Sequence, residues 1–124
     1  MTQKKHILLV DDAGVYLRAV MGYLEGLYDV TPVISASMAK LAIKERKPDL
    51  ILLDCNMPKV SGPEFMEQLR ADDATKDIPI IFLTSRDDAA TVKHVLELKP
   101  EGYILKSTPK EKMLAVIADY FKNH

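Results

Sequence analysis

Four short apolar runs in this sequence end on polar residues that could do chemistry together. The first run ends on Asp11 and Asp12, the second on Asp54, the third on Thr84 and the fourth on Lys106. Three carboxylates that meet at one place repel one another unless a cation lies among them. These residue types therefore indicate a site for a positive ion, provided that the fold brings the ends of the runs together.

The ligand atoms in this set are all oxygens, which favours a hard cation. Mg²⁺ commonly takes one or two carboxylates and keeps several waters. Lys106 adds a compact positive charge, and the Thr84 hydroxyl can donate to an anionic oxygen. Three acids, one Mg²⁺ and one lysine sum to zero charge, so the site suits the addition of an anionic group to an acid, as in aspartyl-phosphate chemistry. Without the ion, repulsion should raise the pKa of at least one carboxyl group.

The apolar runs predict the strands that position these residues. Residues 50–53 are four consecutive large aliphatics, which is typical of a strand buried on both faces of a parallel sheet. The segment 28–34 contains Pro32, which cannot donate to a central ladder and so predicts an edge strand. The other strands are expected at 6–10, 80–83 and 103–105, and the central one is expected to end at Asp54.

Helical periodicity and capping residues fill the segments between the strands. Ser61 and Glu64 have the spacing of a capping box, and Thr108, Pro109 and Glu111 predict an N-cap, a first helical residue and a capping-box partner. The expected helices are 13–26, one capped by Ser35 or Ser37 that runs to about Arg46, one that starts at Ser61, 87–98 with Ser85 and Asp88 in capping-box spacing, and 108–121.

Strands that alternate with helices predict an α/β fold, a doubly wound five-stranded parallel sheet with five helices. The carboxyl ends of parallel strands meet at one edge, so the polar residues would gather on one rim. With 124 residues, 48% of them apolar, we expect a single domain over residues 1–124.

The sequence resembles a receiver domain of two-component response regulators, and it is similar to the single-domain chemotaxis regulator type. The resemblance covers nearly the whole chain and rests on the ordered set Asp11-Asp12, residues 50–54 with Met57-Pro58 and Gly62, residues 80–85, and residues 103–106. It implies a flavodoxin-like sheet with the strand order 2-1-3-4-5.

The resemblance also implies residue roles. Asp54 would accept a phosphoryl group from a sensor histidine kinase or phosphotransfer protein. Asp12 and Asp54 would bind Mg²⁺ with the backbone carbonyl of Asn56, and Asp11 would act largely through water. Thr84 and Lys106 would contact the phosphoryl oxygens, and Tyr103 would be the aromatic residue whose rotamer reports activation.

The same resemblance implies a phosphoacceptor switch rather than an enzyme, with self-phosphorylation and self-dephosphorylation activity. Phosphorylation would change the surface made by helix 87–98, strand 103–105 and helix 108–121, which an unidentified downstream protein or effector domain would read. Two departures concern the neighbouring loops: Lys106 precedes Ser107 where the family usually has proline, and Pro100 lies before the last strand. A cis bond before serine costs about 2.5–4 kcal/mol, so we predict a trans Lys106–Ser107 peptide.

Three other functions remain open from the residues. A Mg²⁺-dependent phosphohydrolase would need a general acid two residues after the nucleophile, where this chain has Asn56. A flavodoxin-like cofactor binder would need a phosphate-binding loop after the first strand, where Asp11 and Asp12 would repel phosphate. A receiver used only for docking would not need the acidic set.

Composition narrows the partners. The net charge of −1 gives no broad basic surface, so we expect no direct nucleic-acid or membrane binding. The single cysteine, Cys55, is expected to be a small core residue and fits a reducing cytoplasm. His6, His94 and His124 lack partners at ligand spacing and are expected to be exposed or packing residues.

Overall fold

Strands and helices alternate along the chain in the computed structural model, which describes residues 4–85 and 89–124. Five parallel strands form one sheet in the order β2-β1-β3-β4-β5, as predicted. The elements are β1 (His6–Val10), α1 (Gly14–Leu24), β2 (Asp29–Val33), α2 (Ala36–Glu45), β3 (Leu50–Asp54), α3 (Gly62–Arg70), β4 (Ile80–Thr84), α4 (Ala89–Glu97), β5 (Gly102–Leu105) and α5 (Lys110–Lys122).

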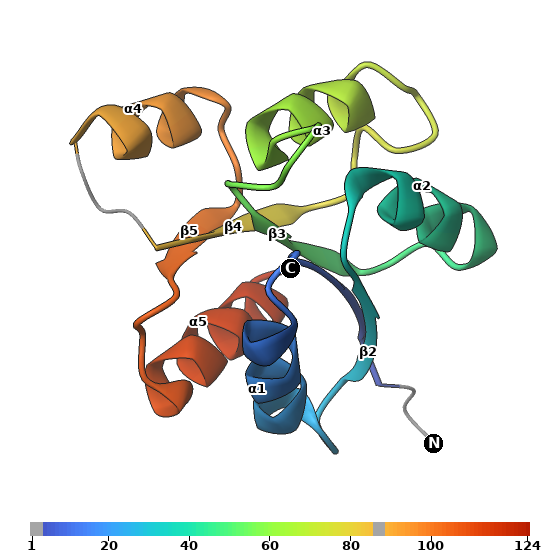
Figure 1. The fold of residues 1–124 in the computed structure, drawn as a ribbon. Coiled ribbons are helices and arrows are strands. Elements are labelled where there is room, and N and C mark those ends of the chain that lie inside the picture. The colour runs from blue at the N-terminus through green and yellow to red at the C-terminus, as the bar shows by residue number, and fades with distance from the viewer. Residues whose placement is uncertain (1–3, 86–88) are drawn as a thin grey trace.

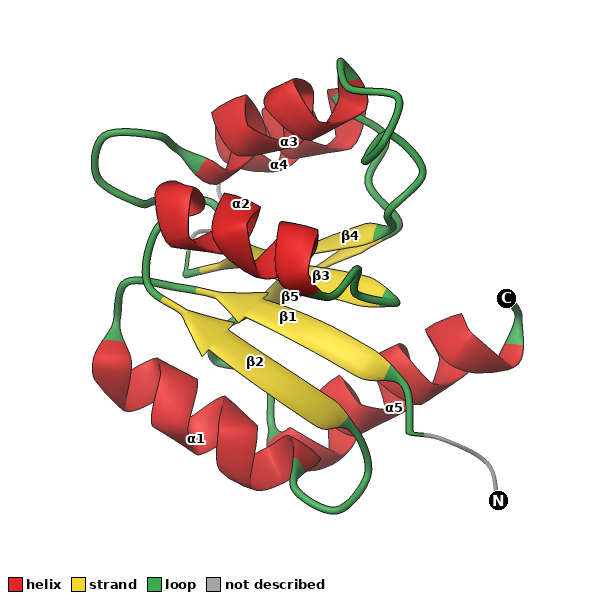
Figure 2. Cartoon of the chain, turned by 90° about the vertical axis from the view of Figure 1, so that its right-hand side faces the viewer, coloured by secondary structure: helices red, strands yellow, loops and turns green. Residues whose placement is uncertain are grey.

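The helices cover the sheet in two layers. Helices α1 and α5 lie against one face, and α2, α3 and α4 lie against the other (Figures 1 and 2). Every residue of β1, β3 and β4 is buried, because each of these strands is covered on both faces. Two apolar clusters result, one around Phe65 and Phe82 and one around Leu9 and Leu52. The sheet is therefore a rigid platform whose carboxyl edge can hold side chains in place.

Local sequence signals explain several element boundaries. Strand β2, which contains Pro32, lies at an edge of the sheet, as expected. The Ser35 side chain accepts a hydrogen bond from the Met38 N–H and caps α2. Ser61 and Glu64 form the predicted capping box at the start of α3. These three predictions are confirmed.

The predicted start of the last helix is wrong by one residue. Pro109 has an extended backbone (φ −60°, ψ 152°) and occupies the N-cap position of α5, without a side-chain cap. Thr108 therefore lies outside the helix, and Glu111 is one position too early to complete a capping box. Helix α4 is described from Ala89, so the predicted start at Asp87 and the proposed pairing of Ser85 with Asp88 lie outside the described residues.

Gly62 brings the start of α3 against the end of β3. A Cβ atom at this position would overlap the carbonyl oxygen of Asp54 and crowd the backbone of Cys55. The Gly62 N–H also donates to the Cys55 carbonyl at 3.1 Å. The loop that follows Asp54 is therefore fixed by the absence of a side chain at Gly62. No peptide bond of the described residues is cis, which agrees with the predicted trans Lys106–Ser107 bond.

Candidate functional site

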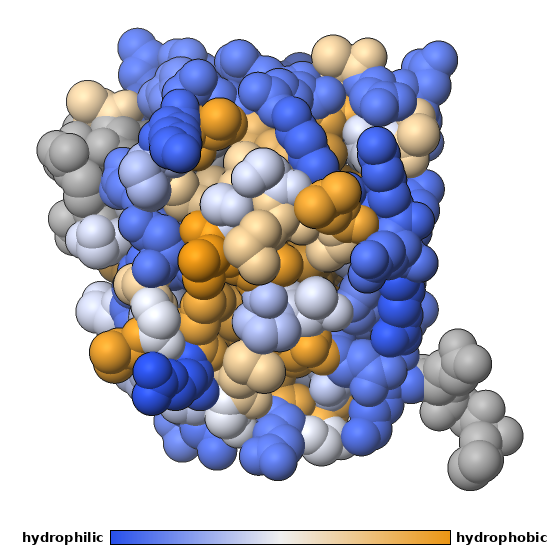
Figure 3. Space-filling view, turned by 45° about the vertical axis from the view of Figure 1, so that its right-hand side comes forward, coloured by the Kyte–Doolittle hydropathy of each residue, from blue (hydrophilic) through white to orange (hydrophobic). Residues whose placement is uncertain are grey.

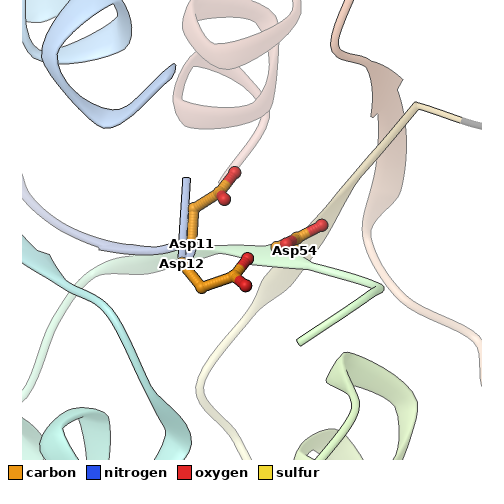
Figure 4. A group of neighbouring side chains, drawn as sticks. All are labelled: Asp11, Asp12 and Asp54. Atoms are coloured by element: carbon orange, nitrogen blue, oxygen red, sulfur yellow. The ribbon is translucent and has the colours of Figure 1, made fainter. Parts of the chain in front are cut away.

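Three carboxylates meet at the carboxyl edge of the sheet. Asp11 and Asp12 directly follow β1, and Asp54 ends the neighbouring strand β3. One oxygen from each residue lies within 4.8 Å of the others, and the three side chains lie next to one another at the ends of the two strands (Figure 4). Asp11 and Asp54 are buried, whereas Asp12 is exposed. The sequence prediction that the ends of β1 and β3 form one acidic rim is thus confirmed as geometry.

Backbone N–H groups orient the two buried acids. The Oδ1 atom of Asp11 accepts from the Ala13 N–H at 2.8 Å, and the Oδ1 atom of Asp54 accepts from the Asn56 N–H at 3.2 Å. In each case the donor lies two residues further along the chain, so the turn after the strand fixes the carboxylate. We refer to Asp11, Asp12 and Asp54 together as the acidic rim.

Lys106 supplies a positive charge at the acidic rim. Its Nζ atom lies 2.7 Å from Oδ2 of Asp11 and 3.4 Å from Oδ1 of Asp54. Burial alone would lower the pKa of Lys106, but the contact with Asp11 and the charge of Asp54 outweigh it and raise that pKa. The lysine backbone is anchored as well, since its N–H donates to the Thr84 carbonyl at 2.8 Å. Lys106 is therefore charged and held between the two buried acids.

The surroundings of Asp54 alter its protonation. Burial, followed by the charge of Asp11, raises the pKa of Asp54 to about 6, although the Asn56 N–H and Lys106 pull in the opposite direction. The direction of this pKa shift agrees with the sequence expectation, but its largest cause is burial rather than the expected repulsion between the acids. One lysine does not compensate three acids, so the rim favours a further cation.

Thr84 and Tyr103 lie on the same face of the sheet but not at the same level. Thr84 ends β4 and is 1% exposed, whereas Tyr103 lies earlier along β5 and is 37% exposed. Tyr103 pairs with Phe82, and Phe82 shares its face with Thr84 two residues later. Both side chains therefore point to the face covered by α4. Cys55, next to Asp54, is buried as predicted, and burial raises the pKa of its thiol to about 11.

The sequence reasoning missed Tyr16. Its ring lies in the first turn of α1, and the Lys106 Nζ atom is 4.9 Å from the ring centroid. Burial, followed by the charge of Asp11, raises the pKa of the Tyr16 hydroxyl to about 12. The available signal was its position four residues after Asp12, on the first helical turn beside the rim. Periodicity placed Leu17 and Val20 on the core face and assigned Tyr16 no role.

Comparison with known proteins places this geometry in a family. The family model for the response regulator receiver domain matches residues 7–118. The chain belongs to the response regulator receiver domain family. Membership favours the predicted switch over the phosphohydrolase and the cofactor binder.

Individual relatives agree with this assignment. The receiver is 36% identical over 112 residues to the phosphate regulon transcriptional regulatory protein PhoB of Pseudomonas aeruginosa, covering 90% of this chain and 49% of PhoB. It therefore spans about half the length of that curated relative. The BeF₃-activated receiver domain of Klebsiella pneumoniae RstA has a TM-score of 0.82 and 32% identity, covering 91% of this chain and 95% of the other. The Mn²⁺-bound response regulator Rcp1 has a TM-score of 0.77 and 28% identity, covering 90% and 88%.

The acidic rim fits the metal that receiver domains use. Its donor atoms are carboxylate oxygens from Asp11, Asp12 and Asp54, and the exposed Asp12 leaves one side open for water ligands. This oxygen-only set suits Mg²⁺ better than a metal that prefers nitrogen or sulfur. Among the described residues, the helices are too short or too polar to span a bilayer.

Proposed function

We propose that this receiver is a phosphorylation-dependent signalling switch whose phosphoacceptor is Asp54. The observation that carries the proposal is the position of Asp54, buried at the end of β3, within 4.8 Å of two other carboxylates and 3.4 Å from Lys106. A surrounding of this kind is costly for stability and is typical of a functional site. Residues 1–124 would act as one receiver domain.

Mg²⁺ would be held by the side chains of Asp12 and Asp54 together with the backbone carbonyl of Asn56, and Asp11 would act largely through water. When bound, the ion would neutralise negative charge that otherwise opposes phosphorylation. The rim supports this assignment through its oxygen donors, and the Mn²⁺-bound form of Rcp1 shows that a similar receiver takes a divalent cation.

The chain's own residues have separate tasks in the transfer. A carboxylate oxygen of Asp54 attacks the phosphorus of a phosphohistidine, the new P–O bond forms as the P–N bond breaks, and the leaving imidazole keeps the electron pair and takes up a proton. Lys106 pairs with a phosphoryl oxygen, and the Thr84 hydroxyl donates to another. The same groups would support self-phosphorylation from small phosphodonors, and self-dephosphorylation when water attacks the acyl phosphate.

The signal would leave through the surface of α4, β5 and α5. Leu96, Tyr103 and Val116, one from each element, are exposed apolar side chains that a partner could cover. Movement of Thr84 toward the phosphoryl group would leave space for Tyr103 to turn inward, because both point to the α4 face. A downstream protein or an effector domain would then meet a changed surface on this receiver.

The phosphoryl donor would be a sensor histidine kinase or a phosphotransfer protein. Val15, at the start of α1 and three residues after Asp12, is 82% exposed. Figure 3 shows apolar side chains gathered in the middle of one face of the molecule, framed by hydrophilic ones. An exposed apolar area suits a protein donor rather than a small molecule alone.

Phosphorylation of Asp54 is tested with acetyl phosphate as donor. We expect intact-mass spectrometry to show one added phosphoryl group in the presence of Mg²⁺. Labelling should disappear in Asp54→Asn and in the wild type with EDTA. The matched control is Asp49→Asn, which removes an acid far from the rim and should label normally. Undiminished labelling of Asp54→Asn would refute the assignment.

A further inference from the structure

Lys106 needs a restraint that does not depend on the acids. Its side chain has four rotatable bonds, so holding it in one conformation costs rotamer freedom. In this structure Asp11 and Asp54 supply the attraction, at 2.7 and 3.4 Å. Both acids change charge partners when a cation binds or when Asp54 carries a phosphoryl group. The attraction that holds Lys106 would then weaken or shift.

Tyr16 contacts Lys106 in a way that those events leave unchanged. The ammonium group lies 4.9 Å from the ring centroid, within the range of a cation–π interaction. The ring is neutral, and it is packed against the apolar cluster that contains Leu17 and Ile104. The Lys106 side chain is only 19% exposed, although it is charged. The ring therefore limits both the position of the ammonium group and its access to water.

The Tyr16 hydroxyl does not explain why this residue lies here. Within the part of the chain that the structure describes, this hydroxyl is buried and has no hydrogen-bond partner. A buried donor without a partner costs stability and contributes no contact. The feature of Tyr16 that acts on the site is thus the ring.

We propose that Tyr16 is a positioning residue for Lys106, and that its ring holds the ammonium group at the acidic rim whatever occupies the carboxylates. The effect on phosphorylation rests on the proposed function, in which Lys106 contacts the phosphoryl group. The contact between ring and ammonium group does not, and it can be measured in the metal-free protein.

The test compares two substitutions at Tyr16 with one at a matched position. Tyr16→Leu removes the ring, and Tyr16→Phe keeps the ring and removes the hydroxyl. Tyr23→Leu is the control, because Tyr23 lies on the same helix and packs against the same apolar cluster. Thermal melting reports whether the variants are equally folded. Tyr16→Met, whose side chain is longer, unbranched and better able to fill an irregular gap, repeats the test if Tyr16→Leu lowers the melting temperature.

Two readouts are expected to separate the variants. With acetyl phosphate and Mg²⁺, Tyr16→Leu should label Asp54 roughly fivefold to twentyfold more slowly than the wild type, while Tyr16→Phe and Tyr23→Leu should stay within about twofold. In ¹H–¹⁵N spectra of the metal-free protein, the Lys106 ammonium signal should be visible in the wild type and in Tyr16→Phe. It should broaden through exchange with water in Tyr16→Leu. Lys106→Ala assigns the signal.

The outcomes distinguish this inference from the proposed function. If the wild type is not labelled on Asp54, the proposed function fails, and the ammonium spectra alone decide the role of Tyr16. If the wild type is labelled and Tyr16→Leu matches Tyr23→Leu in both readouts, the positioning role is overturned and the phosphoacceptor stands. Equal loss in Tyr16→Phe and Tyr16→Leu would assign the effect to the hydroxyl and would also overturn the proposal.

Discussion

The two edges of the sheet differ in how their charged side chains are partnered. At the carboxyl edge, Asp11, Asp12 and Asp54 share one lysine, and two of these acids are buried. At the amino edge, Asp49 and Asp29 each have a partner of their own. The Asp49 carboxylate accepts from the His6 N–H at 2.7 Å, and Arg46 contacts Asp29 at 3.3 Å.

The contrast indicates which edge is built for stability and which for chemistry. The hydrogen bond from the His6 backbone to Asp49 at the amino edge lowers the free energy of the folded state, because the donor and the acceptor both gain a partner. Crowded acids at the carboxyl edge raise it until a cation arrives. Functional sites commonly carry a cost of this kind, so neutralising an acid should have opposite effects on stability at the two edges.

The largest effect is expected from a substitution at Gly62, where α3 packs closely against the end of β3 at the carboxyl edge. Gly62→Ala should lower the free energy of unfolding by about 2–4 kcal/mol, because its Cβ would overlap the Asp54 carbonyl and displace α3 or the end of β3. Gly22→Ala in α1 is the control: it has open space and should stabilise by about 0.5–1 kcal/mol. Chemical denaturation measures both. Equal behaviour of the two variants would show that the approach at Gly62 is not constrained.

The second test neutralises one acid at each edge. In metal-free protein, Asp54→Asn should raise the free energy of unfolding by about 1–2 kcal/mol, a value reduced for solvent screening from the shift of the Asp54 pKa to about 6. Asp49→Asn should lower it by about 0.5–1 kcal/mol, because the His6 N–H loses a charged acceptor.

Magnesium sharpens this second comparison. Added Mg²⁺ should raise the melting temperature of the wild type and of Asp49→Asn, but should do so less for Asp54→Asn and Asp12→Ala, because these two lack a proposed ligand. If Asp54→Asn melted lower than the wild type without metal and kept the full Mg²⁺ response, the charge contrast between the edges would be wrong.

The pH dependence should also differ in sign between the edges. The folded pKa of Asp54 is about 6 against an ordinary value of 3.8, so the folded chain binds the proton more tightly and stability falls as pH rises through this window. Burial, with the charge of Arg46, lowers the pKa of His6 below 6.5, so that group costs stability as pH falls through 6.5. Denaturation with EDTA from pH 4 to 8 should show the benefit of Asp54→Asn growing to its full value, about 1–2 kcal/mol, above pH 6. His6→Gln should differ from the wild type only in lacking the fall in stability as pH drops through 6.5. Parallel curves for all three proteins would contradict this.

The smallest effect is expected at an exposed pair of the amino edge. Arg46 and Asp29 are about half exposed, at 55% and 50%, and water screens their attraction. Asp29→Asn should lower the free energy of unfolding by less than about 0.5 kcal/mol, and 0.5 M salt should abolish the difference. A loss as large as that of Asp49→Asn would mean that exposure is a poor guide to the strength of pairing at this edge.

The sequence was sufficient to predict which residues meet at the acidic rim. Strands without polar alternation must be buried on both faces, and the residues that end such strands must share an edge, so Asp11, Asp54 and Lys106 could be placed together. The positions of side chains beyond the strand ends were harder to predict from the sequence. Whether Tyr16 contacts Lys106 depends on how α1 is rotated about its own axis. The periodicity of apolar residues determines that rotation only to within about one residue, so it did not predict the contact.

The register of the strands explains the surroundings of His6, which the sequence did not determine. His6 was expected to be exposed or a packing residue, and it is buried with its Nε2 atom 2.8 Å from the Thr31 hydroxyl on β2. That pairing follows from the alignment of β1 with β2, which the sequence does not specify. The start of α5 was misplaced for a local reason, because Pro109 adopts an extended backbone and takes the N-cap position itself.

The pairing of β1 with β3 has a consequence for the order of folding. The backbone N–H of His6, the first residue of β1, donates to Asp49, which directly precedes β3. The two residues are 43 positions apart, and α1, β2 and α2 lie between them. The chain must close this long loop before Asp11 and Asp54 can meet. A partly folded chain in which only α1 and β2 have packed against β1 would carry none of the repulsion between the two acids. The repulsion between the acids of the rim arises only when β1 and β3 pair, so Asp54→Asn should accelerate that step rather than the parallel pairing of β1 with β2.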